Sequence, residues 1–188
     1  MRSEQAGGFY PSQWAKMRGI TLVETLVVIS ILGILAAIAV PSFKATIERN
    51  RREAYANQIF EDLALARSEA IKRGVPVTVC PSTNGTGCSG LSSWTDGWII
   101  FVDLASYGTR DTNTETLLRV HGALASGWTV IKNNDPYFTY GPLGTPFGVS
   151  NFTLAICPRL TSCDATSNTQ QTNIVMTSVG RVRTLNYN

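Results

Sequence analysis

The sequence contains a single histidine, His121, which leaves little scope for imidazole chemistry. It has no Gly-x-Ser-x-Gly elbow, no phosphate-binding loop and no His-Glu-x-x-His metal motif. Four aspartates stand singly near predicted turns, where aspartate is common for backbone reasons: Asp96, Asp103, Asp111 and Asp135. These absences argue against an enzyme, and the sequence predicts no catalytic, metal or cofactor site.

Charged residues are also scarce, at 15% of the chain, where about a quarter is usual for globular proteins. Part of the chain is therefore expected to avoid water. The formal net charge of +3 is too small to indicate a nucleic-acid binder by itself. A length of 188 residues suits one domain plus an anchor.

Cysteine is infrequent, and the residues Cys80, Cys88, Cys157 and Cys163 fall in two local pairs. Neither pair has the Cys-x-x-Cys spacing of redox and zinc motifs, so we expect two disulfides in an oxidising compartment. Four cysteines permit three connectivities, and sequence alone does not decide between them. We favour Cys80–Cys88 and Cys157–Cys163, because each bond would close a short loop.

One long apolar run does occur, ITLVETLVVISILGILAAIAV at residues 20–40. As a helix it would be about 30 Å long, the thickness of a bilayer's hydrocarbon core. Lys16 and Arg18 precede it, so the positive-inside rule places everything after Pro41 outside the cytoplasm. Glu24 lies within the run, where a carboxylate costs about 2.5–3.5 kcal/mol and therefore implies a partner.

Three interpretations of this run compete. A secretory signal cut after Ala39 would release a free periplasmic binding protein, but apolar signal regions are usually only about 7–15 residues long. A plain membrane anchor explains the length of the run and leaves Glu24 unexplained. The third interpretation accounts for both features and depends on the residues around Gly19.

The segment RGITLVE at residues 18–24 resembles the processing site of type IV prepilins and type II secretion pseudopilins. The resemblance implies that a prepilin peptidase cuts between Gly19 and Ile20 and methylates Ile20. Many family members have phenylalanine at the position of Ile20, and isoleucine keeps that residue large and apolar.

The same resemblance implies assembly roles for Glu24, Gly33 and Pro41. Glu24 of one subunit would pair with the freed amine of another, because either charge left alone in lipid or in a fibre core is costly. Gly33 and Pro41 weaken a helix, so the stretch between them would bend or melt when the subunit leaves the membrane. A simple kink is the alternative.

After residue 41 the pattern remains helical as far as Gly74, a predicted C-cap, and Pro76, a predicted stop. The apolar stripe of this amphipathic helix consists of Ile59, Leu63, Ala66 and Ala70, flanked by Phe60, Ala64 and Ile71. Charged residues, Asp62 among them, are expected to lie mostly off the stripe.

Beyond Gly74, short β-like runs alternate with turn residues. The expected strands are residues 75–80, 98–103, 117–121, 128–132, 137–140, 152–157, 173–178 and 181–185. The fold class is therefore α+β, a long N-terminal helix packed on an antiparallel β-sheet head. We expect a leader (1–19), a transmembrane helix (20–40), an amphipathic helix (41–74) and a periplasmic β-rich domain (75–188).

Three further segments resemble the GspH/FimT branch of this family, which includes the minor pilins FimU and FimT and the pseudopilin GspH. They are ARSEAIKRGVPVTVCPS at residues 66–82, WTDGWIIFVD at residues 94–103 and the sequence GRVR at residues 180–183. The branch implies a minor type IV pilin of the inner membrane, single-pass, with its head in the periplasm and later in the extracellular pilus. It implies as partners other major and minor pilins, the prepilin peptidase and the pilus assembly machinery.

FimT relatives associated with DNA uptake carry a Gly-Arg-x-Arg motif. The resemblance therefore implies that Arg181 and Arg183, on one face of a strand after Gly180, contact double-stranded DNA. Lys132 and Arg159 would extend the basic patch. The alternatives are a solvated strand edge, a GspH-like pseudopilin of type II protein secretion, and the free periplasmic binding protein.

Overall fold

A computed structural model describes residues 19–105, 107–148, 152–158, 163, 171–177 and 179–186 of the chain. The chain divides into two compact units, Met1–Lys44 and Ala45–Asn188. One helix, α1 (Leu22–Arg73), begins in the first unit and continues into the second, which we call the head. The backbone of α1 stays helical through Pro41.

The apolar stripe of α1 forms the centre of the head. Ala56, Ile59, Leu63, Ala66 and Ala70 recur at helical spacing, and each is at most 3% exposed. They pack in one cluster with residues from both β-sheets. The predicted stripe is confirmed at its four central positions.

The predicted edges of the stripe are wrong. Phe60 and Ile71 are 43% and 54% exposed, and Ala64 is also exposed. Asp62, expected off the stripe, is 3% exposed. The sheets cover a narrower arc of the helix than its apolar residues occupy, and the arc includes Asp62 because Asp62 has polar partners on the sheet.

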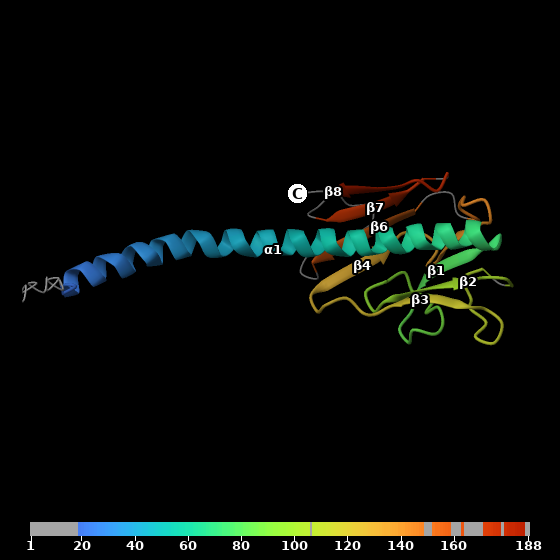
Figure 1. The fold of residues 1–188 in the computed structure, drawn as a ribbon, viewed down its shortest axis with the longest axis horizontal. Coiled ribbons are helices and arrows are strands. Elements are labelled where there is room, and N and C mark those ends of the chain that lie inside the picture. Colours follow the sequence, from blue (N-terminus) through green and yellow to red (C-terminus); the bar gives the residue numbers. More distant parts are fainter. Residues whose placement is uncertain are drawn as a thin grey trace, which may run out of the picture. The chain divides into compact units, whose positions relative to one another are not determined.

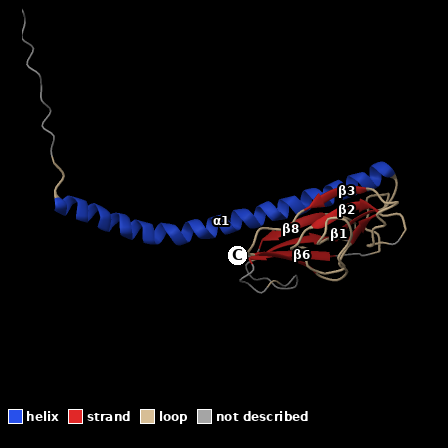
Figure 2. Ribbon diagram, turned by 90° about the horizontal axis from the view of Figure 1, so that it is seen from below, coloured by secondary structure: helices blue, strands red, loops and turns tan. Residues whose placement is uncertain are grey.

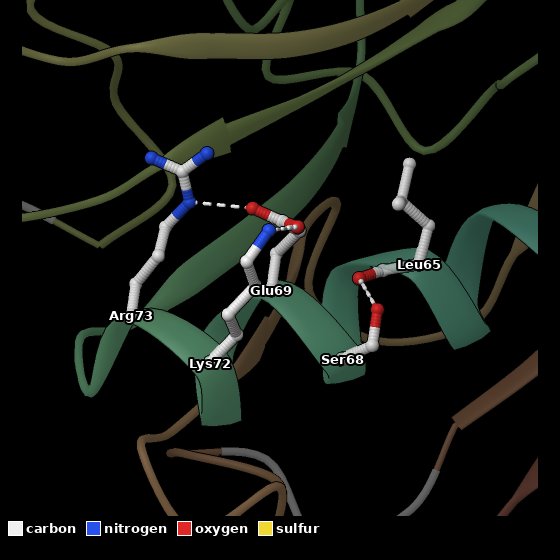
Figure 3. A network of polar contacts seen from close by, with 5 residues as sticks. All are labelled: Leu65, Ser68, Glu69, Lys72 and Arg73. Atoms are coloured by element: carbon white, nitrogen blue, oxygen red, sulfur yellow. Dashed lines mark hydrogen bonds and ion pairs between the residues drawn. The ribbon is translucent and has the colours of Figure 1, made fainter.

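The last turn of α1 carries a compact ion-pair network (Figure 3). Glu69 Oε2 lies 2.5 Å from Arg73 Nε, and Glu69 Oε1 lies 3.5 Å from Lys72 Nζ. The hydrogen bond from Arg73 holds the pKa of Glu69 below its usual value. Gly74 ends the helix as predicted, because its φ of 67° suits glycine and its N–H reaches Ala70 O at 3.0 Å.

Eight strands follow α1. They are β1 (Val77–Pro81), β2 (Trp98–Val102), β3 (Leu117–His121), β4 (Trp128–Lys132), β5 (Phe138–Tyr140), β6 (Phe152–Pro158), β7 (Thr172–Met176) and β8 (Val182–Asn186). The sequence predicts each of these strands, and for β3 and β4 it predicts the same limits. The others differ by one or two residues at one or both ends.

The strands form two antiparallel sheets, ordered β3-β2-β1-β5 and β4-β6-β7-β8. The sequence predicts an antiparallel head, which is confirmed, and it does not predict the division into two sheets. In Figure 1 strands β7 and β8 lie on one side of the head portion of α1, and β2 and β3 lie on the other. In Figure 2, which is turned by 90° about the horizontal axis from that view, the labelled strands lie on one side of the helix.

Strands β1 and β2 are buried along their whole length, so both faces of their sheet are covered. Trp98 and Ile100 face the core beneath α1. Ile99 and Phe101 belong to a second, smaller cluster with Cys80, against which Cys88 packs. The loop between the two cysteines therefore covers the outer face of this sheet.

Candidate functional site

The N-terminal end of α1 has a defined cap. Gly19, Ile20 and Thr21 are not helical, and α1 begins at Leu22. Thr21 Oγ1 accepts a hydrogen bond from the backbone N–H of Glu24 at 3.2 Å. The carbonyl oxygen of Thr21 accepts the first helical bond, from Thr25 N at 3.1 Å. Thr21 is thus the N-cap residue, and Glu24 is the third residue of the helix.

The side chain of Glu24 is exposed in the first turn of α1. A carboxylate at this end of a helix is favoured by the helix dipole. The predicted scissile bond, between Gly19 and Ile20, lies just before the cap. Lys16 and Arg18, which the positive-inside argument uses, lie outside the described residues.

The apolar part of α1 is not covered by its own chain. Its most apolar window has a mean hydropathy of 2.6, and none of that window is buried. Large side chains along it are about half or more exposed, for example Ile29 at 59% and Ile34 at 64%. By its length and composition this helix could cross a membrane. A Cβ added at Gly33 would meet no other atom within 4 Å.

In the head, the turn before β8 fixes the GRVR segment. Gly180 N donates to Thr177 O at 2.8 Å, and Thr177 N donates to Arg181 O at 3.0 Å. Gly180 has a φ of 76°, and a Cβ there would lie 3.1 Å from Gly144 O and 3.2 Å from Pro146 Cδ. Both the backbone conformation and the close approach therefore require glycine.

Arg181 and Arg183 are both exposed. In the β7–β8 ladder Val182 lies opposite Met176, which is in the core, and Arg183 lies opposite Val175. Side chains alternate along a strand, so Arg183 points away from the face that carries Val182. The GRVR segment therefore packs Val182 against the core and exposes the guanidinium groups of Arg181 and Arg183.

A cavity of about 220 Å³ adjoins this segment, and it was not predicted from the sequence. Its lining residues are Phe60, Ala64, Arg67, Tyr140, Gly180, Arg181 and Val182. Arg67 Nη1 donates to Gly180 O at 3.4 Å, joining segments 113 residues apart. Burial raises the pKa of Tyr140. The lining contains two guanidinium groups and no carboxylate.

The predicted extension of the basic patch by Lys132 is wrong. Lys132 is 2% exposed, and its Nζ donates to the backbone oxygens of Asn133, at 3.3 Å, and Asp135. Nζ also lies 5.0 Å from the centre of the Phe152 ring. The amine is thus enclosed by the head. Arg159 lies outside the described residues.

Disulfides join Cys80 to Cys88 and Cys157 to Cys163, which are the pairs that the sequence favours.

His121 stacks on Trp98 with ring centres 3.8 Å apart. Within the part of the chain that the structure describes, no group of three or more His, Cys, Asp or Glu residues could hold a metal ion.

Comparison with protein families gives two matches. Residues 55–180 match the family described as Type II transport protein GspH, and residues 14–40 match the prokaryotic N-terminal methylation motif. The fimbrial protein EcpB of Eikenella corrodens is 39% identical over 74 residues, which are 37% of this chain and 43% of that protein. The match thus spans less than half the length of this curated relative.

Two solved structures have a similar fold. For the type IV minor pilin FimU of Pseudomonas aeruginosa the TM-score is 0.54 at 21% identity, covering 72% of this chain and 89% of FimU. For the minor pseudopilin EpsH from the type II secretion system of Vibrio cholerae it is 0.52 at 14% identity, covering 76% and 99%. At these identities the likeness shows the fold alone.

Proposed function

Because the chain belongs to the GspH family of pilin-like proteins, which its residues 55–180 match, we propose that it is a minor pilin of a type IV pilus. It is inserted in the inner membrane by α1, with the head in the periplasm. After processing it joins major and minor pilins in the pilus and helps to prime assembly.

The observation that carries this proposal is the uncovered apolar surface at the start of α1. That surface is in contact with lipid before assembly and with the helices of other subunits afterwards. The same helix continues into the core of the head, so one element carries both the apolar surface and part of the core. A match to a fimbrial protein, though partial, supports the pilus over the secretion system.

In this proposal the prepilin peptidase cuts after Gly19 and methylates the new amine of Ile20. The match of residues 14–40 to a methylation motif supports this step. Glu24 then pairs with the amine of a neighbouring subunit, because an unpaired charge among apolar helices would be costly. Gly33 and Pro41 would allow α1 to bend or melt during extraction.

Mass spectrometry of the mature chain, purified from a host with the pilus machinery, tests the processing step. The expected N-terminus is methylated Ile20. A mature chain that begins at Val40 would identify the protein as a free periplasmic binding protein instead. That alternative requires a cut at Ala39, inside α1, whereas Gly19 lies outside the helix.

Substitution of Glu24 tests the assembly step. Glu24→Val should leave cleavage after Gly19 intact and greatly reduce incorporation into sheared pili, measured by immunoblotting. Glu61→Val, at an exposed acid on the same helix, is the control and should incorporate normally. Normal incorporation of Glu24→Val would contradict the proposed pairing.

The rival within the family is a pseudopilin of type II secretion, with EpsH as a structural neighbour. Deletion of the gene separates the two. Loss of pili with normal protein secretion supports the minor pilin, and loss of secretion with normal pili supports the pseudopilin.

DNA binding is a further proposed activity of the head. Arg181 and Arg183 are both exposed. Arg67 and Arg181 line the same cavity, so cationic groups from two segments lie close together there. Two guanidinium groups on a strand can contact successive phosphates of a DNA duplex.

The head, residues 45–188, provides the test. Binding to duplex DNA should weaken as salt rises, and the variant with both Arg181→Ala and Arg183→Ala should lower the salt slope by roughly 1.8. A control with Arg51→Ala and Arg73→Ala removes the same charge from the helix and should keep most of the slope. No binding at low salt, or an unchanged slope in the first variant, would reject DNA binding.

A further inference from the structure

We infer that Thr21 is a positioning residue for proteolytic processing, because its side chain ends α1 and keeps the Gly19–Ile20 peptide outside the helix. The inference rests on the proposed cleavage after Gly19. It assigns to Thr21 a role before assembly begins, at the step that generates the mature amine.

The contacts at the cap carry the inference. The Thr21 hydroxyl oxygen takes the N–H of Glu24 at 3.2 Å, which is one of the four N–H groups that a helix start leaves without an internal partner. Gly19, Ile20 and Thr21 are not helical, and helical structure begins at Leu22. The helix boundary and the scissile bond are thus two residues apart.

Without this cap, extension of the helix toward the N-terminus would be favoured. In a membrane, backbone polar groups without water must pair with each other, and a longer helix achieves that. The residue before the cap, Ile20, can adopt a helical conformation, and Gly19 lacks any side-chain obstacle. The Thr21 hydroxyl oxygen already accepts a hydrogen bond from Glu24 N, so extension of the helix gains no new partner for that N–H group.

The position of the boundary matters for the chemistry. Hydrolysis adds one water across the bond between the Gly19 carbonyl carbon and the Ile20 nitrogen, leaving a carboxylate on Gly19 and an ammonium group on Ile20. Attack requires access to the Gly19 carbonyl carbon, and a helical turn surrounds that carbon with neighbouring backbone. A peptide held in a non-helical conformation meets the peptidase without prior unwinding.

The chain offers a matched control in Thr25, one turn later. Its hydroxyl donates to Thr21 O at 3.3 Å and lies within α1, so it does not cap the helix. Thr25→Val and Thr21→Val make the same chemical change four residues apart. Thr21→Ser and Thr21→Asn keep a side-chain oxygen at the N-cap, which serine and asparagine both supply well.

The test is a pulse-chase of the full chain in membranes with a co-expressed prepilin peptidase. The first-order rate of leader loss is followed by the mobility shift and by mass spectrometry. Thr21→Val should be cut roughly three- to tenfold more slowly than the natural sequence, in line with the free energy of an N-cap. Thr21→Ser, Thr21→Asn and Thr25→Val should stay within about twofold of it.

Hydrogen exchange in detergent micelles adds a readout that is independent of the peptidase. In the uncut chain, Thr21→Val should increase the protection of the Val23 amide, because a helix that extends to Ile20 gives this N–H the Gly19 carbonyl oxygen as its acceptor. Thr25→Val should leave the Val23 amide unchanged.

Each failure has its own signature. If Thr21→Val is cut as fast as the natural sequence, or if Thr21→Ser and Thr21→Asn are as slow as Thr21→Val, the capping role is wrong. If the natural sequence is itself not cut after Gly19, the proposed function fails at its processing step, whatever the variants do.

Discussion

The indole Nε1 of Trp98 donates a hydrogen bond to Oδ2 of Asp62 at 2.7 Å, and this bond links β2 to α1 in the interior of the head. The other carboxylate oxygen accepts a bond from Arg119 Nη1 on β3, also at 2.7 Å. The Asp62 side chain is 4% exposed. One carboxylate of α1 therefore joins the helix to two strands of one sheet.

Removing that carboxylate should destabilise the head. In Asp62→Ala the buried N–H of Trp98 loses its acceptor and Arg119 loses its ion pair, so we expect the free energy of unfolding to fall by about 2–4 kcal/mol. Urea unfolding of residues 45–188, followed by tryptophan fluorescence, measures the change. Glu61→Ala, at the exposed neighbouring position, should change it by less than about 0.5 kcal/mol. Equal effects of the two variants would contradict the role of Asp62.

The sequence predicts the elements of the fold well and their tertiary contacts poorly. The strands are found because β-branched and aromatic runs lie between turn residues, as at Trp128–Lys132. Helical spacing likewise identifies Ile59 and Leu63 as core residues. These signals are local in the chain, so one sequence is enough to read them.

The missed features depend on residues far apart in the sequence. Asp62 is buried because the indole N–H of Trp98 donates a hydrogen bond to it, and no residue near Asp62 in the sequence indicates that partner. Lys132 is enclosed because the carbonyl oxygens of the loop that follows it turn back on its amine. For the site, the sequence identifies the GRVR segment, and only the fold places Arg67 beside it.

The enclosed amine of Lys132 should make stability depend on alkaline pH. Burial lowers the pKa of Lys132 to about 8 from 10.5. Between these values the unfolded chain binds more protons than the folded chain, so this group makes the head more stable as pH rises from about 8 to 10.5. Between pH 7 and pH 10, the unfolding free energy of the natural head should increase by on the order of 2 kcal/mol relative to that of Lys132→Met.

Lys72→Met is the matched control for this measurement, because the Lys72 side chain is 75% exposed. Urea unfolding of the three proteins at pH 7, 8.5 and 10 gives the comparison. If Lys132→Met and Lys72→Met keep a constant difference over this range, Lys132 is not enclosed as the structure places it.

The bond between Cys80 and Cys88 should contribute to stability in two ways. It closes a short loop, which restricts the unfolded chain. It also holds that loop against Ile99 and Phe101 on the outer face of the sheet. Replacing both cysteines by alanine should lower the unfolding free energy by about 2–4 kcal/mol.

Thermal unfolding with and without reductant checks this prediction. A reductant should lower the midpoint of the natural head more than that of the variant, which keeps only Cys157–Cys163. Equal shifts in the two proteins would mean that the Cys80–Cys88 bond adds nothing to the folded head.

Two aspartates of the β2–β3 connection should respond to acid in opposite directions. Asp103 is fully buried, with Oδ2 accepting from Thr78 Oγ1 at 2.7 Å and Gly108 N at 2.9 Å. Burial raises its pKa above 3.8 despite these bonds, and the charge of Glu115 adds to the rise. Asp111 accepts bonds from the backbone of Asn113 and from Thr114, which lower its pKa.

The signs follow from proton binding. With its raised pKa, folded Asp103 binds more protons than unfolded Asp103, so acidification from pH 7 to pH 4 favours the natural head over Asp103→Asn. For Asp111 the folded state binds fewer protons, so the same acidification reduces any advantage of the natural head over Asp111→Asn. Urea unfolding at pH 7, 5.5 and 4 measures both differences. Because the two variants make the same chemical change in one loop region, changes of the same sign would contradict the buried position of Asp103.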